Sequence, residues 1–187
     1  MQSLDHHLLI AMPSLEDPYF NRSVTYLCEH NEEGAMGLII NQPVDISLSQ
    51  LLVTTGLKQE PYSLPPGLSD QVMLGGPVAT DRGFVLHSAI AGLEQSHQLA
   101  DDLMLTSSRD ILNLIGSETP PEHYLVALGY AGWTAGQLEQ EIADNSWITI
   151  PAEPELIFDI PHEQLWQQAT ARLGIDVWQL SSDVGHS

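Results

Sequence analysis

Two pairs of residues in this chain could supply a nucleophile and its general base. Ser107 and Ser108 are adjacent, and His87 could activate either hydroxyl if the fold brings the imidazole alongside. Cys28 with His30 is the second possible pair. A reactive thiol needs a cationic neighbour, however, and the residue after Cys28 is acidic, so a small buried side chain is the other interpretation of this cysteine. Either pair would suit an enzyme of the hydrolase type.

A glycine-containing turn followed by an arginine could bind an anion. Gly75, Gly76 and Pro77 follow a short apolar run, and the two glycines could let backbone N–H groups approach an anion closely. A tight turn, with the proline ending the strand, is the alternative. Arg82 follows soon after and is one of only 5 basic side chains, so it stands out as a possible ligand contact.

Two serines and an arginine precede a predicted helix. Hydroxyls and a guanidinium at a helix start would suit a carboxylate or a phosphate, although Arg109 could equally be a salt-bridge strut. Trp133 lies at a strand-to-helix corner, where it either lines a pocket or covers the hydrophobic core. The candidates for binding a ligand or partner are therefore Gly75, Gly76, Pro77, Arg82, Ser107, Ser108, Arg109 and Trp133.

The familiar catalytic and cofactor motifs are absent from the sequence. There is no G-x-S-x-G elbow, no phosphate-binding loop and no G-x-G-x-x-G motif. The sequence from His162 begins like the zinc-binding motif H-E-x-x-H, but Trp166 stands where the second histidine would be needed. No two of the 8 histidines have the i, i+4 spacing that places both on one helical face. We therefore expect no metal and no cofactor, and we favour a protein without catalytic residues.

The charge of the chain is strongly negative. Asp and Glu number 25 against 5 Lys and Arg, which gives a formal net charge of −20. Direct DNA binding requires clustered basic side chains, so this third possible function is disfavoured. An acidic surface either keeps the protein in solution or docks onto a basic partner. We expect an unknown protein partner or a small anionic ligand, and no direct nucleic-acid binding.

Length and composition predict one globular domain. The 187 residues are 43% hydrophobic and 16% charged, which supports a single domain over 1–187 with an irregular excursion at 56–71. No apolar run is long enough to cross a bilayer, and the N-terminal apolar run is too short for a signal peptide. With only 1 cysteine, these features predict a cytoplasmic protein without membrane attachment.

Short apolar runs of strand length recur between Gly, Pro and Asn residues. Helical segments interrupt them irregularly, an order that favours an α+β fold over a regular βαβ series. The predicted strands are Leu8–Met12, Val24–Glu29, Met36–Asn41, Val72–Leu74, Gly83–His87, Leu103–Thr106, Tyr124–Gly129 and Trp147–Ile150.

Four predicted helices carry start or stop signals. Ser47, with a Gln three residues on, forms a capping box for a helix that ends at Gly56. Ser107 with Asp110 repeats this device before a helix that stops at Gly116.

The other two predicted helices lie near the C-terminus. Thr134 opens the third helix, which buries Leu138 and Ile142. Its acidic side chains are expected to face water: Glu139, Glu141 and Asp144. Pro161 fits the first turn of the fourth helix, and Gly174 is expected to end it.

Nine ordered blocks of sequence resemble the YqgE/AlgH family of bacterial proteins over essentially the whole chain. The blocks are HLLIAMPSL from His7, VTYLCEHN from Val24, GAMGLIINQP from Gly34, VMLGGPV from Val72, DRGFVLHS from Asp81, LTSSRDIL from Leu105, LVALGYAGW from Leu125, QLEQEI from Gln137 and NSWIT from Asn145. The resemblance implies a single α+β domain with a small closed β-barrel and a bifurcated sheet, surrounded by about four helices.

The resemblance implies little about function. The AlgH branch is labelled a transcriptional regulator, and the family has no established enzyme activity from which site residues could be transferred. We therefore expect a non-enzymatic, cytoplasmic binding or regulatory protein that acts indirectly, through a protein partner or a small anionic ligand. The alternative is a hydrolase that uses Ser107 or Ser108 with His87, or Cys28 with His30.

Overall fold

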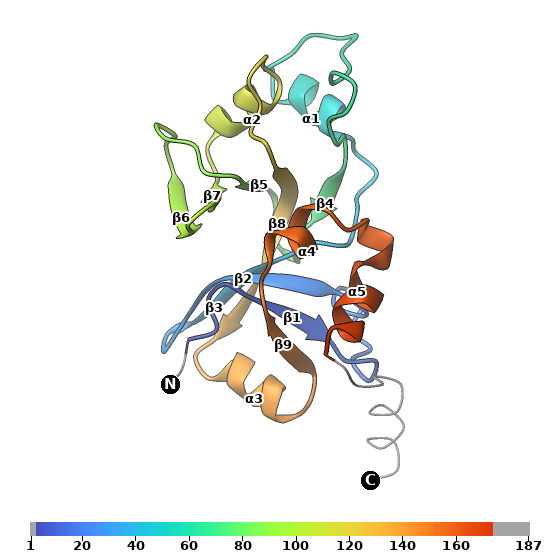
Figure 1. The fold of residues 1–187 in the computed structure, drawn as a ribbon, viewed down its shortest axis with the longest axis vertical. Helices are drawn as coiled ribbons and strands as arrows, with labels where there is room; N and C mark the ends of the chain where they lie inside the picture. The colour runs from blue at the N-terminus through green and yellow to red at the C-terminus, as the bar shows by residue number, and fades with distance from the viewer. Residues whose placement is uncertain (1–2, 174–187) are drawn as a thin grey trace.

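Nine strands and five helices form the part of the chain that the computed structural model describes, residues 3–173 (Figure 1). The strands are β1 (His7–Ala11), β2 (Val24–Asn31), β3 (Gly34–Ile39), β4 (Val72–Leu74), β5 (Val78–His87), β6 (Ser96–Ala100), β7 (Leu103–Thr106), β8 (Tyr124–Thr134) and β9 (Trp147–Pro151). The helices are α1 (Leu48–Thr54), α2 (Arg109–Ile115), α3 (Gln137–Ala143), α4 (Pro154–Phe158) and α5 (His162–Ala171).

The long strand β8 joins two parts of one sheet. Its first half pairs with β5 in antiparallel and with β4 in parallel orientation. Its second half pairs with β3, from which the sheet continues through β2 and β1 to β9. In Figure 1, β8 runs from the end of the molecule that holds α1 and α2 to the end that holds α3.

The mixed α/β fold is confirmed, but a closed barrel is not shown. The sheet follows the order β6-β7-β5-β8-β3-β2-β1-β9, so β6 and β9 are its two ends. Within residues 3–173 no pairing joins these two strands. The described sheet is therefore curled, mostly antiparallel and open, and it branches where β4 adds to β8.

Strand β1 is buried on both faces. Leu8 and Ile10 point into the main core with α4 and α5, whereas Leu9 and Ala11 point into a second core beneath α3. Because successive side chains of a strand alternate between its faces, this explains why the strand is a continuous apolar run. A third core packs α1 and α2 against β4, β5 and β8.

Two elements were not predicted from the sequence. Strand β6 consists of SHQLA, whose two most exposed side chains are polar, so it lacks an apolar signal. Helix α4 spans 5 residues, too few for a periodic pattern to show. Strand β8 also continues past its predicted end, because Gly129 lies inside the strand with a φ of +77° instead of ending it.

The helix signals were partly correct. Ser47 caps α1 through the predicted capping box, and Gly56 follows this helix with a φ of +80°. The capping box at Ser107 is wrong, because Ser108 is the N-cap of α2 and its side chain makes no capping hydrogen bond. Helix α2 ends at Gly116 as expected.

The last two predicted helices begin later than expected. Gly136 is the N-cap of α3, and Thr134 instead donates its backbone N–H to the Gln137 side chain. Pro161 is the N-cap of α5, just before its first turn, and the predicted end at Gly174 lies outside the described residues. Among the described helices, none has the length and apolar character needed to cross a membrane.

Candidate functional site

Two neighbouring cavities share Ser107 in their walls. The larger, which we call the Arg82 cavity, has a volume of about 350 Å³ and is lined by residues of β2, β3, β5, β6 and β7. Small-molecule sites commonly combine apolar walls with a few polar groups. The lining residues are Cys28, Glu29, Met36, Arg82, Phe84, Gln95, His97, Leu99, Leu105 and Ser107.

Arg82 is the basic side chain of this cavity. It is exposed, and its guanidinium lies over the Phe84 ring, 5.2 Å from the ring centroid. Within residues 3–173 no carboxylate lies at ion-pair distance from it. The positive charge of Arg82 is therefore not neutralised by a neighbouring acid and can be offered to a bound molecule.

A bulge in β5 presents Arg82 to the cavity. Strand β5 pairs with β8 at Val78 and again from Gly83 onward, so residues 79–82 depart from the regular ladder. Ala79 in this bulge has a φ of +49°. Opposite the bulge, a Cβ on Gly129 would meet the Val78 carbonyl oxygen at 3.1 Å. Glycine at this position of β8 therefore allows the bulge to pack closely.

The predicted anion-binding turn is part of the sheet packing. The Gly75 N–H donates to the Leu128 carbonyl at 2.8 Å, and the Gly75 carbonyl accepts from Ile39 N–H at 2.8 Å. A Cβ on Gly76 would lie 2.1 Å from the carbonyl carbon of Tyr130. The two glycines therefore let the backbone cross β8 at short range just before Pro77 and the Arg82 bulge.

The smaller cavity, which we call the Arg109 cavity, has a volume of about 200 Å³. It lies between one face of the sheet and helices α1 and α2. Ser107, Ser108 and Arg109 therefore come together here, as the sequence suggested, while Arg82 lines the neighbouring cavity. The lining residues are Leu51, Thr55, Asp81, Gly83, Val85, Thr106, Ser107, Ser108, Arg109, Leu112, Val126 and Leu128.

Arg109 is a strut, but to a carbonyl group and not to an acid. Its Nη2 donates to the Thr55 carbonyl at the C-terminal end of α1, where the helix dipole favours a cation. This bond connects α2 to α1. The neighbouring Ser108 Oγ is buried and has no hydrogen-bond partner.

A buried histidine, His87, is hydrogen-bonded to Thr106, one of the residues that line the Arg109 cavity. The Nδ1–H of His87 donates to the Ser88 carbonyl at 2.8 Å, so its Nε2 is left to accept from the Thr106 hydroxyl at 2.7 Å. Thr106 in turn lies 2.6 Å from Ser96 Oγ. The expected partners of His87, Ser107 and Ser108, make no hydrogen bond to it. The missed signal was the third hydroxyl of the run, Thr106, which directly precedes the two serines.

The burial of His87 predicts a pH dependence of stability. Desolvation lowers the pKa of His87 below its ordinary value, despite the opposing hydrogen bond to the Ser88 carbonyl. The unfolded chain therefore takes up a proton at higher pH than the folded protein does, so the free energy of unfolding should decrease as the pH falls below about 6.5. Urea unfolding at several pH values measures this decrease, and NMR titration of the ring measures the pKa of His87.

The variant His87→Gln supplies the control for this prediction. Its amide does not titrate, so its stability should fall less than that of the wild type over the same pH interval. A wild-type His87 that titrates above 6.5, or an equal fall in both proteins, would contradict the assignment.

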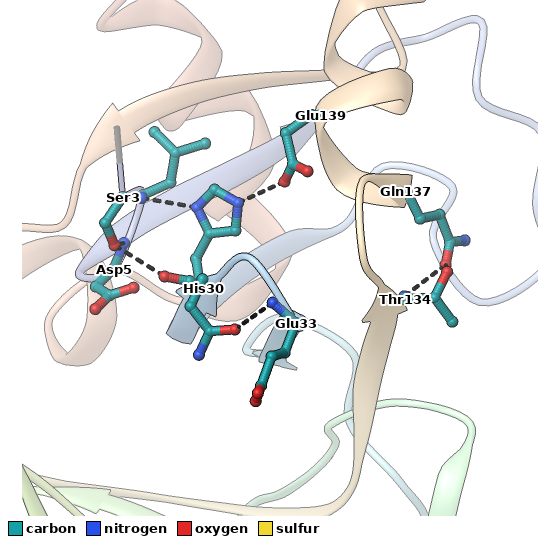
Figure 2. A network of polar contacts seen from close by, with 9 residues as sticks. Ser3, Asp5, His30, Glu33, Thr134, Gln137 and Glu139 are labelled. Carbon is teal, nitrogen blue, oxygen red and sulfur yellow. Dashed lines mark hydrogen bonds and ion pairs between the residues drawn. The ribbon is translucent and has the colours of Figure 1, made fainter. Parts of the chain in front are cut away.

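Cys28 and His30 do not form a nucleophile and base pair. The His30 Nδ1 accepts from the Leu4 backbone N–H at 2.9 Å, so its Nε2 carries the proton and donates to Glu139 at 2.5 Å (Figure 2). Both ring nitrogens are thus occupied. Burial raises the pKa of the Cys28 thiol, and the neighbouring Glu29 raises it further, which disfavours the thiolate.

Two acidic side chains of α3 contact the sheet, contrary to the expectation that they face water. Glu139 accepts from His30, as described above, and Figure 2 shows this bond between β2 and α3. Glu141 Oε1 accepts from the indole N–H groups of Trp133 at 3.0 Å and Trp147 at 2.9 Å. The third, Asp144, is exposed.

Trp133 belongs to the core and not to either cavity. It is only 6% exposed and packs against Phe20 and Trp147, with ring centroids 6.2 Å and 6.1 Å away. Of the two interpretations of this residue, the structure therefore agrees with the core. Among the described residues, no group of three His, Cys, Asp or Glu side chains is arranged to hold a metal ion.

Comparison with known proteins identifies close relatives along the whole chain. Residues 8–178 match the family model described as AlgH-like. A UPF0301 protein from Shewanella sp. (strain ANA-3) is 57% identical over 187 residues, covering 100% of both chains. A UPF0301 protein from Idiomarina loihiensis is 53% identical, also covering 100% of both chains.

Solved structures agree with this result. The AlgH protein from Pseudomonas aeruginosa is 46% identical, with a TM-score of 0.76 over 96% of this chain and 94% of that chain. A protein from Corynebacterium diphtheriae is 22% identical and shares the fold, with a TM-score of 0.68 over 92% of this chain and 87% of that one. The family indicated by the nine sequence blocks is confirmed: the chain belongs to the AlgH-like family.

Proposed function

We propose that this protein is a non-enzymatic, cytoplasmic binding protein that holds a small anionic ligand in the Arg82 cavity. The observation that carries the proposal is the guanidinium of Arg82, which has no ion-pair partner in the described chain and lines a cavity of about 350 Å³. Guanidinium groups bind carboxylates and phosphates through paired N–H donors. The ligand is therefore expected to carry one of these groups.

The other walls of the cavity restrict the ligand further. Phe84 and Leu105 belong to the main core and offer an apolar surface, while the Gln95 amide and Ser107 hydroxyl can hydrogen-bond to polar atoms. Glu29 also lines the cavity and would repel a second negative charge. These contacts favour a monoanion with an apolar body over a polyanion.

Charge reversal at Arg82 tests the proposal. Octanoate, a carboxylate with a short apolar chain, is expected to bind the wild type, and Arg82→Glu should lower its affinity by about tenfold or more, because a charge-assisted pair is replaced by repulsion. Isothermal titration calorimetry measures the affinity. Native mass spectrometry of both proteins isolated from host cells would show whether a metabolite is retained by the wild type alone.

Two matched variants separate a local effect from a change in total charge. Lys58→Glu makes the same charge change outside both cavities, where Lys58 lies over the Tyr62 ring, and should leave octanoate affinity unchanged. Glu29→Gln removes the negative charge within the cavity and should strengthen binding. Equal octanoate affinity in the wild type and Arg82→Glu would refute the proposed role of this arginine.

Any effect of this protein on transcription is proposed to be indirect. The net charge of −20 opposes close approach to a phosphate backbone, and only 5 basic side chains are available to neutralise phosphates. A ligand-bound form that docks onto a protein partner is the regulatory mechanism that we favour.

The hydrolase alternative retains one geometric feature, the hydrogen bond between His87 and Thr106. Both residues are 0% exposed, and Thr106 is also hydrogen-bonded to Ser96. A nucleophile must reach a substrate carbonyl, which a fully buried hydroxyl cannot do without a local opening of the fold. We therefore favour the interpretation that this pair satisfies the buried imidazole.

A further inference from the structure

We propose that the Arg109 cavity is a second binding site, specific for a small zwitterion: a free aliphatic amino acid. The cavity combines an arginine, an aspartate and an unpaired hydroxyl with an apolar wall. Each of these features corresponds to one part of such a ligand. The two cavities share Ser107, but Arg82 lines only the first and Asp81, Ser108 and Arg109 line only the second, so this proposal does not depend on the function proposed above.

The unpaired Ser108 hydroxyl indicates that a polar atom is expected in the cavity. Ser108 is one of the residues that line the cavity, and its Oγ is buried without a hydrogen-bond partner. Buried polar atoms are nearly always paired, and the exceptions call for an explanation such as a water or a ligand. Although Ser108 is the N-cap of α2, its side chain does not cap the helix, so that role does not account for the hydroxyl.

The two charged side chains of the cavity do not form an ion pair with each other. Arg109 and Asp81 both line it, yet no ion pair joins them within the described residues. Arg109 donates one hydrogen bond to the Thr55 carbonyl and keeps further N–H groups for a carboxylate. The Asp81 carboxylate makes no hydrogen bond in the described structure and can accept from an ammonium group.

The size and composition of the remaining wall define the ligand body. Its aliphatic side chains come from α1, α2 and the sheet: Leu51, Val85, Leu112, Val126 and Leu128. The volume of about 200 Å³ is below the range of about 300–1,000 Å³ that drug-sized ligands occupy. A branched aliphatic amino acid such as leucine meets all three requirements of charge, apolar character and size.

Calorimetric titration with L-leucine tests the proposal on the full chain. We expect saturable binding at micromolar to millimolar concentration. Asp81→Asn should weaken it by about tenfold or more, because the ammonium loses its charged acceptor. The same variant should bind 4-methylpentanoate, which lacks the ammonium group, at least as well as the wild type does, because Asp81 repels a lone carboxylate.

Further variants assign the carboxylate end and control for the charge change. Ser108→Ala should weaken both leucine and 4-methylpentanoate, whereas Asp101→Asn, outside both cavities, should affect neither. Arg82→Glu should leave leucine binding intact, which distinguishes this site from the Arg82 cavity. The absence of saturable leucine binding to the wild type, or an unchanged leucine affinity in Asp81→Asn, would overturn the proposal.

Discussion

Replacing Gly76 with alanine is expected to destabilise the folded protein by about 3 kcal/mol or more. The new Cβ would lie 2.1 Å from the Tyr130 carbonyl carbon, 2.2 Å from the Tyr130 oxygen and 2.4 Å from the Ala131 nitrogen. These are backbone atoms of β8, so no side-chain rotation can relieve the contact. Either β8 or the chain before β5 has to move.

Urea unfolding followed by tryptophan fluorescence measures the change in free energy. Gly132→Ala is the matched control, because its Cβ would meet only the Tyr130 ring, at an ordinary 3.7 Å. Its stability should stay within about 1 kcal/mol of the wild type. A Gly76→Ala variant as stable as Gly132→Ala would show that the two chain segments are not in such close contact.

The same substitution connects stability to the proposed binding site. Gly76 directly precedes Pro77 and the segment that carries Arg82. A Cβ on Gly129 of β8 would meet the Gly76 and Val78 carbonyl oxygens, so this segment packs closely on β8. A shift of this segment would move the guanidinium away from Phe84. If Gly76→Ala folds, its octanoate affinity should therefore fall together with its stability.

The sequence predicted the elements whose side chains are apolar on both faces. Leu8 to Ala11 is a continuous apolar run, and the first residues of β2 are apolar except for Thr25, because both faces of these strands are buried. The capping box at Ser47 was equally informative, since its hydrogen bonds join residues three positions apart. Such local signals do not depend on how the chain folds back on itself.

The Arg82 cavity could not be derived in the same way. Its walls combine Cys28 and Met36 with Phe84, Leu99 and Leu105, which meet only because β3 and β5 both pair with β8. Strand β6, which contributes part of the wall, has no apolar periodicity and was not predicted. The sequence therefore named Arg82 and Ser107 but could not show the cavity in which they meet.

The prediction that the acidic side chains of α3 face water was wrong for a related reason. Helical periodicity separates an apolar face from a polar one, and it assigns every carboxylate on the polar face to solvent. Glu139 and Glu141 instead accept hydrogen bonds from His30 on β2 and from Trp147 on β9. His30 is 109 residues from Glu139 in sequence. Trp147 is only 6 residues from Glu141 but lies on a strand, so the periodicity of the helix does not relate the two residues.

Replacing Glu141 with alanine should therefore destabilise the protein strongly, by about 3 kcal/mol or more. Its Oε1 accepts from two indole N–H groups, on Trp133 and Trp147, which are 6% and 2% exposed. Without this carboxylate both donors remain buried and unpaired, and each hydrogen bond to a charged acceptor contributes about 1.5–3 kcal/mol. The free energy of unfolding in urea measures the loss.

Glu141→Gln and Glu32→Ala separate the lost acceptor from the lost charge. Glutamine keeps an amide oxygen that can accept from the indoles, so Glu141→Gln should recover more than half of the stability lost in the alanine variant. Glu32→Ala removes the same charge from an exposed position and should change stability by less than about 0.5 kcal/mol. Equal losses in Glu141→Ala and Glu32→Ala would mean that the carboxylate acts only through net charge. The hydrogen bonds from the two tryptophans to Glu141 predict instead that the loss of stability is largest in Glu141→Ala, smaller in Glu141→Gln and smallest in Glu32→Ala.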